Sequence, residues 1–210
     1  MKQSLFVVLM FVVGCVVGAW FELDWELDWK LHDVSMYILY VLMFQVGISV
    51  GCSDNLKAVL SHCRPKMLLL PLATVTGTLI FAALISFVLA RWNVFDCMAV
   101  GSGLGYYSLS SILITQLKMD TLGEQLATEL GAIALLANIC RELLALTLAP
   151  FFRRHFGPYA PISAAGVTSI DVALPAIARY SGKEFVPVAI FHGMLLDLSV
   201  PLILPFLCEF

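Results

Sequence analysis

The chain has 210 residues, of which 60% are apolar and only 13% are charged, and its formal net charge is −3. A soluble domain is roughly 45–50% apolar and about 25% charged, and a domain of this length could not hide so much apolar surface in one core. The composition therefore excludes a broad basic surface for nucleic acid and predicts an all-α integral membrane protein.

Five segments are long and apolar enough to span a bilayer, which takes roughly 20 residues as a helix. The first could be read as a signal peptide, because a lipoprotein-like box ends at Cys15. The chain stays apolar after Cys15, however, which favours an uncleaved spanning helix. The five predicted spans are Ser4–Phe21, Val34–Gly51, Met67–Ala90, Leu126–Phe151 and Val186–Leu207.

Two further apolar segments, Met98–Leu117 and Tyr159–Ala178, are rich in Gly, Ser and Pro, which weaken a continuous helix. The two resemble each other, because residues 105–113 and 166–174 both read Gly-x-x-Ser-apolar-Ser/Asp-x-x-Leu. One spanning helix separates them, as in an inverted repeat whose broken helices meet near the membrane midplane. We expect a single transmembrane domain over residues 1–210, with a partial first repeat in 1–55 and a second repeat in 64–210.

Loop charges predict the topology, since basic loops stay in the cytoplasm. The loop of residues 22–33 is acidic and should lie outside, whereas residues 57–66 carry basic residues and should lie inside. If the broken segments crossed fully, Arg153 and Arg154 would lie outside; if they re-enter, these arginines are cytoplasmic, together with Arg179 and Lys183. The sequence thus favours five spanning helices plus two re-entrant segments, with the N-terminus inside and the C-terminus outside, and leaves full crossing as the alternative.

Acidic residues inside membrane helices are costly and usually functional. Glu142 and Asp171 form the best pair for holding a cation or a proton, and Asp197 lies midway along the last span. Asn138 and Arg141 share a helix face with Glu142, at spacings of four and three residues from Asn138. We predict that this face lines a pocket; a static pair between Arg141 and Glu142 is the structural alternative.

The broken segments should supply the rest of the pocket, because irregular backbone in a bilayer is buried in protein or lines a wet cavity. No metal site or cofactor is expected, since the six cysteines include no Cys-x-x-Cys pair. The two tyrosines among the candidates could also contact an ammonium group through their rings. The remaining predicted substrate-binding or proton-binding residues are Tyr106, Tyr107, Ser108, Ser110, Thr168, Ser169 and His192.

Four motifs, in this order along the chain, carry a resemblance to a known family. They are Gly103-Leu-Gly-Tyr-Tyr-Ser-Leu-Ser-Ser-Ile-Leu113, Arg141-Glu-Leu143, Thr168-Ser-Ile-Asp-Val-Ala-Leu-Pro175 and Val188-Ala-Ile-Phe-His-Gly193. Together they resemble the bacterial lysine exporters of the LysO type over nearly the whole chain. The resemblance implies export of L-lysine and of analogues such as thialysine, by exchange with protons across the bacterial inner membrane. It also assigns the family's important membrane acids to Glu142 and Asp171.

The resemblance raises a question of completeness, because family members are expected to carry further membrane helices at the N-terminus. A separate small membrane protein, or a second copy of the chain, would then supply them.

Two other classes stay open: an accessory subunit that does not transport alone, and an intramembrane aspartyl protease using Asp171 and Asp197. The protease motif Gly-x-Gly-Asp is absent, since Tyr106 follows Gly103-Leu-Gly105, so no enzyme is expected. The sequence does not separate lysine from ornithine or arginine as the ligand.

Overall fold

The structure is a computed structural model that describes residues 65–210 apart from residue 90, together with Tyr37, Val41 and Phe44. The chain divides into two compact units, Met1–Val46 and Gly47–Phe210. Apart from those three positions, the predicted spans Ser4–Phe21 and Val34–Gly51 lie outside the described residues.

The described part of the second unit is helical, and no strand occurs in residues 65–89 or 91–210. Its longest helices are α7 and α11, and the other α-helices are shorter. The elements in chain order are η1 (Pro65–Leu68), α4 (Leu69–Ile85), α5 (Val94–Gly101), α6 (Tyr107–Leu122), α7 (Glu124–Thr147), α8 (Ala149–Phe156), α9 (Ala160–Ala165), η2 (Gly166–Ile170), α10 (Leu174–Tyr180), η3 (Lys183–Phe185) and α11 (Val186–Cys208).

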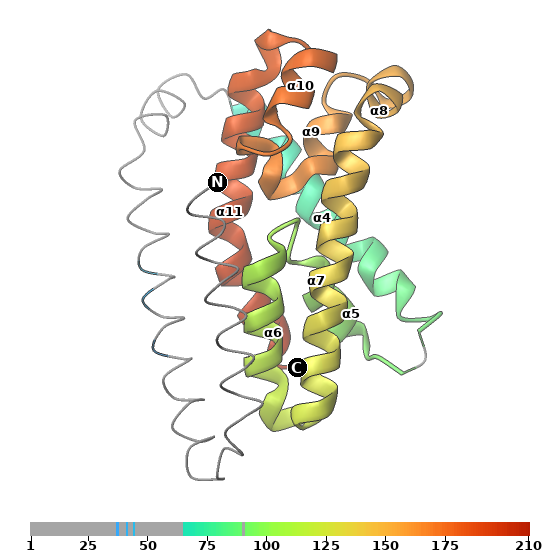
Figure 1. Ribbon diagram of the computed structural model, residues 1–210, viewed down its shortest axis with the longest axis vertical. Coiled ribbons are helices and arrows are strands. Elements are labelled where there is room, and N and C mark those ends of the chain that lie inside the picture. The colour runs from blue at the N-terminus through green and yellow to red at the C-terminus, as the bar shows by residue number, and fades with distance from the viewer. Residues whose placement is uncertain (1–36, 38–40, 42–43, 45–64, 90) are drawn as a thin grey trace, which may run out of the picture. The chain divides into compact units, whose positions relative to one another are not determined.

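Both broken segments form helical hairpins. In Figure 1, α5 runs from one end of the unit to its middle and α6 returns to the same end, where α7 begins. α9 descends from the opposite end, turns through η2 at the middle, and α10 returns to the end from which α9 came. The chain therefore places two hairpin tips at mid-height, one from each end, with α7 running alongside both hairpins.

The local sequence explains where these helices begin and end. Asn93 and Asp96 form a capping box at the start of α5, with the Phe95 N–H donating to Asn93 Oδ1 over 2.6 Å. The glycines that follow α5 end it after only two turns. α7 ends at Thr147 rather than at the predicted Phe151, because Pro150 disfavours helical backbone before it and starts the separate helix α8.

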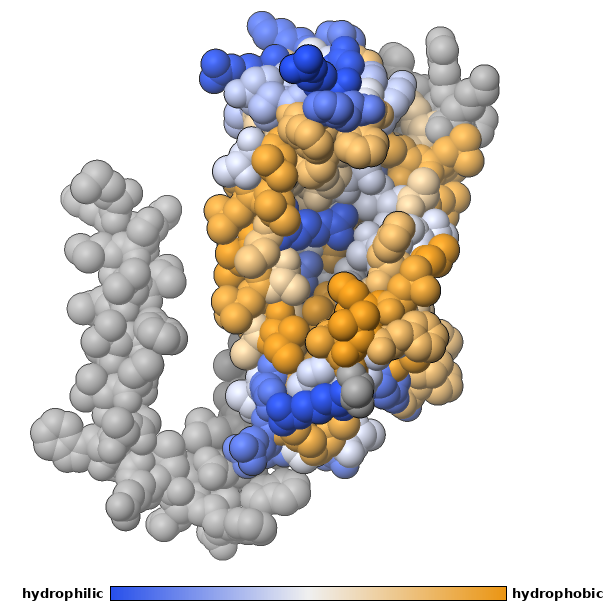
Figure 2. Space-filling view, turned by 90° about the vertical axis from the view of Figure 1, so that its right-hand side faces the viewer, coloured by the Kyte–Doolittle hydropathy of each residue, from blue (hydrophilic) through white to orange (hydrophobic). Residues whose placement is uncertain are grey.

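The third predicted span is also shorter than expected, because the helix of α4 stops at Ile85 and a turn follows. Two described stretches are long and apolar enough to cross a membrane by length and composition, Glu124–Thr147 and Lys183–Cys208. On the face that Figure 2 shows, apolar residues predominate across the middle of the described part, and hydrophilic residues gather at both ends. This distribution fits a protein whose middle lies in lipid.

The basic residues at the two ends differ in their pairing. At the end where α6 meets α7, Arg91 pairs with Glu129 at 2.8 Å and Lys118 pairs with Asp96 at 2.9 Å. At the other end, Arg153 and the remaining basic residues of α8, α10 and η3 make no ion pair with any described residue. Uncompensated positive charge therefore collects at the end that carries α8 and α10.

Candidate functional site where two hairpin tips meet

The two hairpin tips touch through their backbones. The Val167 N–H, in the second tip, donates to the Leu104 carbonyl of the first over 2.9 Å. Gly166 has a φ of +67°, and a Cβ there would collide with the Leu104 carbonyl oxygen. Gly105 has a φ of +99°, and its Cβ would lie 3.1 Å from the Ala165 carbonyl oxygen of the second tip, a tight contact without a collision. Glycine is therefore required on both sides of this contact.

Asn138, on α7, holds the first tip. Its Oδ1 accepts from the Gly105 N–H over 2.8 Å, and its Nδ2 donates to the carbonyl oxygens of Ala134 at 2.9 Å and Val100 at 3.3 Å. The same amide nitrogen lies 3.4 Å from Ser110 Oγ. The side chain is 3% exposed, so these bonds satisfy an otherwise costly buried amide.

Arg141, one turn further along α7, holds the second tip. Its Nε donates to the Ala164 carbonyl and its Nη2 to the Ser163 carbonyl, both over 3.0 Å, while Nη1 reaches Thr78 Oγ1 at 3.4 Å. These carbonyls belong to the last turn of α9, where backbone acceptors lack partners in the helix. Arg141 makes no ion pair with Glu142 or with any other carboxylate that the structure describes.

His192, on α11, ties the second tip to α4. Its Nε2 lies 3.0 Å from Thr74 Oγ1, and its Nδ1 lies 3.3 Å from Ser169 Oγ. A neutral imidazole donates from one ring nitrogen and accepts at the other, so one of these two hydroxyls accepts from the ring and the other donates to it. Ser169 in turn donates to the Ala189 carbonyl over 2.9 Å. The imidazole is fully buried and acts as a hydrogen-bonded tie between helices.

Three carboxylates gather beside the tips. Asp171 lies close enough to Glu142 and to Asp197 for its charge to act on both. Asp171 is exposed, Glu142 is half-buried and Asp197 is 9% exposed. One Glu142 oxygen, Oε2, is buried and has no hydrogen-bond partner among the described residues. No described lysine, arginine or histidine forms an ion pair with any of the three, so the cluster carries uncompensated negative charge when ionised.

The first tip adds a polar wall and a helix terminus to this cluster. Tyr106 is half-buried and near enough to Asp171 and Asp197 to feel their charges. It immediately precedes α6, whose N-terminus has no side-chain cap. The first N–H groups of a helix attract anions. The uncapped N-terminus of α6 thus directly follows a tyrosine that the charges of Asp171 and Asp197 reach.

The other predicted site residues take different positions. Tyr107 and Ser108 are exposed on the first turn of α6. Ser110 and Thr168 are buried, and their hydroxyls donate locally, to the Tyr107 carbonyl at 3.2 Å and the Ala165 carbonyl at 3.0 Å. These two hydroxyls stabilise the broken segments themselves. In the described part, no group of three His, Cys, Asp or Glu side chains could hold a metal ion, and the three carboxylates are thus not arranged as a chelate.

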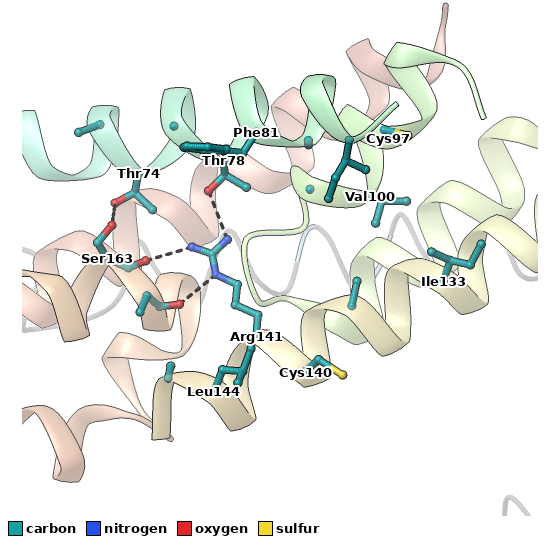
Figure 3. A pocket seen from close by; sticks show the side chains of 18 of the residues that line it. Thr74, Thr78, Phe81, Cys97, Val100, Ile133, Cys140, Arg141, Leu144 and Ser163 are labelled. Carbon is teal, nitrogen blue, oxygen red and sulfur yellow. Dashed lines mark hydrogen bonds between the residues drawn. The ribbon is translucent and has the colours of Figure 1, made fainter. Parts of the chain in front are cut away.

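A cavity of about 930 Å³ lies on another side of α7. Figure 3 shows Arg141 reaching across it from α7 toward Thr78 on α4 and Ser163 on α9. The lining includes Arg141, but it does not include Glu142, Asp171 or Asp197. Arg141 and the carboxylates, which the sequence pattern assigned to one pocket, thus face different spaces.

Sequence reasoning missed the ion pair between Asp96 and Lys118, whose side chains are only 3% and 2% exposed. Lys118 is a single charge within an otherwise uncharged run from residue 97 to residue 119, which is the signal that could have identified it as buried. The hydroxyls of Thr74 and Thr78 were also missed, because threonine in an apolar helix carries no distinctive pattern.

Comparison with known proteins adds to this geometry. The chain is 33% identical over 202 residues to a putative lysine exporter of Haemophilus influenzae, covering 95% of each chain. It is also 33% identical to lysine exporter LysO of Escherichia coli, over 83% of this chain but only 54% of that protein. No solved structure matches. The profile of the lysine exporter LysO family matches residues 8–208. This chain therefore belongs to the lysine exporter LysO family.

Proposed function

We propose that the chain exports L-lysine, or a related cationic amino acid or analogue such as thialysine, through the carboxylate cluster beside the hairpin tips. The observation that carries the proposal is the grouping of Glu142, Asp171 and Asp197 with no basic partner among the described residues. Uncompensated carboxylates inside a membrane are expensive. They are retained where a cation or protons can neutralise them.

The arrangement also suits the other end of an amino acid. The uncapped N-terminus of α6 follows Tyr106, which lies near Asp171 and Asp197. In the proposed complex, the ligand's carboxylate binds at this helix terminus and its ammonium groups bind at the acidic side chains. Asn138, Arg141 and His192 act as positioning residues, because they fix the two tips on which this geometry depends.

Proton antiport follows from competition at the same carboxylates. A carboxylate that holds an ammonium group must be ionised, and protonation on the opposite side of the membrane displaces the ligand. Lysine affinity should therefore fall as pH falls. Alternating access would expose the cluster first to one face and then to the other.

The proposed topology has five spanning helices and two hairpins that re-enter from opposite faces, as an inverted repeat. In this topology the N-terminus lies in the cytoplasm and the C-terminus outside. It is supported by the unpaired basic residues at the α8–α10 end, which the positive-inside rule places in the bacterial cytoplasm. The paired Arg91 and Lys118 lie at the opposite end.

In the alternative, the chain is a main or accessory subunit that transports only together with a small membrane protein or a second copy of itself; the match to the Escherichia coli exporter is partial. The match covers 54% of that exporter, so just under half of it has no counterpart in the alignment. Transport assays should therefore include the chain by itself and with such a subunit.

Efflux of labelled lysine from loaded cells tests the proposal. Glu142→Gln and Asp171→Asn keep the size of each side chain and remove its charge, so both should abolish lysine efflux while the protein still inserts. Asp120→Asn is the matched control, because Asp120 is an exposed carboxylate at the far end of α6. Robust efflux by both cluster variants would rule the mechanism out, as would equal losses in the control.

A further inference from the structure

Asp197 lies at the midpoint of α11 and is the most buried of the three clustered carboxylates, with 9% of its surface exposed. Among the described residues, none forms an ion pair or a hydrogen bond with its side chain. Ser199, the nearest hydroxyl along the helix, donates to the Leu196 carbonyl instead, over 2.8 Å. A buried carboxylate without a donor is costly, so this side chain is suited to hold a ligand.

The helix also frees a backbone acceptor at this point. Pro201 lies inside α11, four residues after Asp197, and a proline has no N–H to donate to the carbonyl four residues before it. The backbone carbonyl of Asp197 therefore lacks its usual helical donor, and no N–H from another described element replaces it. Its carboxylate and its carbonyl together offer several acceptors to an ammonium group, which has three N–H donors.

The chain's own first 64 residues offer no cation for this position. The predicted spans Ser4–Phe21 and Val34–Gly51 contain no lysine or arginine. A basic side chain in a loop or at a helix end extends toward water rather than toward the middle of the bilayer. The positive charge that compensates Asp197 is therefore expected from a ligand. The lysines and arginines of this part of the chain are Lys2, Lys30, Lys57 and Arg64.

The acids of the cluster have a definite order. Asp171 is close enough for its charge to act on Glu142 and on Asp197, whereas no such effect joins those two. The charge of Asp197 acts on Tyr106 more strongly than that of Asp171, and Glu142 is not among the charges that reach it. Glu142 and Asp197 are therefore the two ends of the cluster, with Asp171 between them and Tyr106 beside Asp197.

A dibasic amino acid has its charged groups in a matching order. Its carboxylate and α-ammonium group share one carbon atom, and its second ammonium group lies at the far end of the side chain. The proposed function places the carboxylate at the N-terminus of α6, which directly follows Tyr106, and the Tyr106 hydroxyl can itself donate to a carboxylate. The α-ammonium group would then lie nearest to the acid beside Tyr106.

We infer that Asp197 and its free backbone carbonyl bind the α-ammonium group of the exported amino acid, while Glu142 binds the side-chain ammonium group. Asp171, between them, contributes to both. This inference rests on the proposed function and assigns the acids of that site to particular groups of the ligand.

The assignment separates two kinds of selectivity. The compound 6-aminohexanoate has the carboxylate and the side-chain ammonium group of lysine but no α-ammonium group. Norleucine has the carboxylate and the α-ammonium group but no side-chain ammonium group. Lysine should therefore be preferred over 6-aminohexanoate through Asp197 and over norleucine through Glu142.

Calorimetry with these three ligands, on the full chain in lipid nanodiscs, tests the assignment. Asp197→Asn removes the charge at constant size, so it should lower lysine affinity about tenfold or more and leave 6-aminohexanoate affinity unchanged. Glu142→Gln should do the converse: the preference for lysine over norleucine is lost, and the preference over 6-aminohexanoate remains.

Pro201→Ala tests the backbone carbonyl separately. Alanine returns the N–H that closes the Asp197 carbonyl, so lysine affinity should fall about fivefold while 6-aminohexanoate affinity stays the same. Pro205→Ala is the matched control, because Pro205 also lies inside α11. That change returns a donor to the carbonyl of Pro201, one turn further from Asp197, and should leave the affinities for all three ligands unchanged.

An Asp197→Asn variant that still prefers lysine over 6-aminohexanoate, or that binds both ligands equally weakly, would overturn the inference. Equal effects of Pro201→Ala and Pro205→Ala would also overturn it, and this pair decides the matter if Asp197→Asn does not fold. If the unaltered chain prefers lysine over norleucine but not over 6-aminohexanoate, the inference fails and the proposed function stands. If lysine does not bind at all, both fail.

Discussion

The first hairpin, α5–α6, and the second, α9–α10, reach the same place but are held by different chemistry. The first is closed at its outer end by the buried pair of Lys118 and Asp96, and at its tip by Asn138. The second is held by hydrogen bonds from Arg141 and His192, and its tip is a 3-10 segment that ends beside the exposed Asp171.

This difference predicts that the two hairpins differ in how readily they open. A buried ion pair is strongly destabilised when one partner leaves, so the arms of the first hairpin should stay together. The second hairpin is held by hydrogen bonds from Arg141 and His192 and by no ion pair among the described residues, and we expect it to open first. In the proposed transporter, the second hairpin would be the part that rearranges for alternating access.

The largest expected effect comes from breaking the ion pair. Lys118→Met leaves the carboxylate of Asp96 buried without a partner and should destabilise the protein by about 3–5 kcal/mol. Chemical unfolding in detergent measures this change. Hydrogen exchange should show lost protection in α5 and α6 but not in α10. A second change, Asp96→Leu, should recover most of the loss. If Lys118→Met unfolds α10 as readily as α5, the hairpins are not independent units.

Gly166→Ala tests the contact between the tips. The added Cβ requires an unfavourable positive φ and collides with the Leu104 carbonyl oxygen, so a loss of about 2–4 kcal/mol is expected. Gly123→Ala is the control for φ alone, because Gly123 also has a positive φ of 80° but a Cβ there meets nothing within 4 Å. Equal losses in the two variants would show that the tips do not press against each other.

Asn138→Leu removes the amide that holds the first tip. The N–H of Gly105 loses its acceptor, which should lower the free energy of unfolding by about 1–3 kcal/mol. Lysine affinity should fall as well, because the Tyr106 end of α6 is no longer fixed. Unchanged affinity in a correctly folded variant would mean that the first tip does not shape the ligand site.

The smallest effect is expected for His192→Phe in the second hairpin. Thr74 keeps its bond to the Leu70 carbonyl and Ser169 keeps its bond to the Ala189 carbonyl, so only the ties through the ring are lost. The expected loss is about 1 kcal/mol, with faster hydrogen exchange confined to η2 and α10. A loss as large as that of Lys118→Met would erase the contrast between the hairpins.

Much of this arrangement could be predicted from the sequence, because its signals are local. The density of glycine and serine predicted the interruptions in both segments, Met98–Leu117 and Tyr159–Ala178. The preference for re-entry over crossing, and the choice of Glu142, Asp171 and Asp197 as site residues, stay predictions. The meeting of the two hairpins could also be anticipated, since their motifs repeat.

The remaining features depend on tertiary contacts that no local pattern reveals. Asn138 and Arg141 share a face with Glu142 along α7, but only the packing of α9 against α7 shows that Arg141 holds backbone. Arg141 consequently faces a cavity that Glu142 does not line. Lys118 and Asp96 are 22 positions apart and meet only because the hairpin closes.

Direct binding by the purified chain tests the carboxylate cluster most simply. Lysine and norleucine differ in the side-chain ammonium group, so calorimetry with both ligands isolates the cluster's contribution. We predict that lysine binds and norleucine does not, that lysine affinity falls as pH falls, and that Asp171→Asn removes the difference between the ligands. Equal binding of lysine and norleucine by the unaltered chain would contradict the assignment of the cluster as the lysine site.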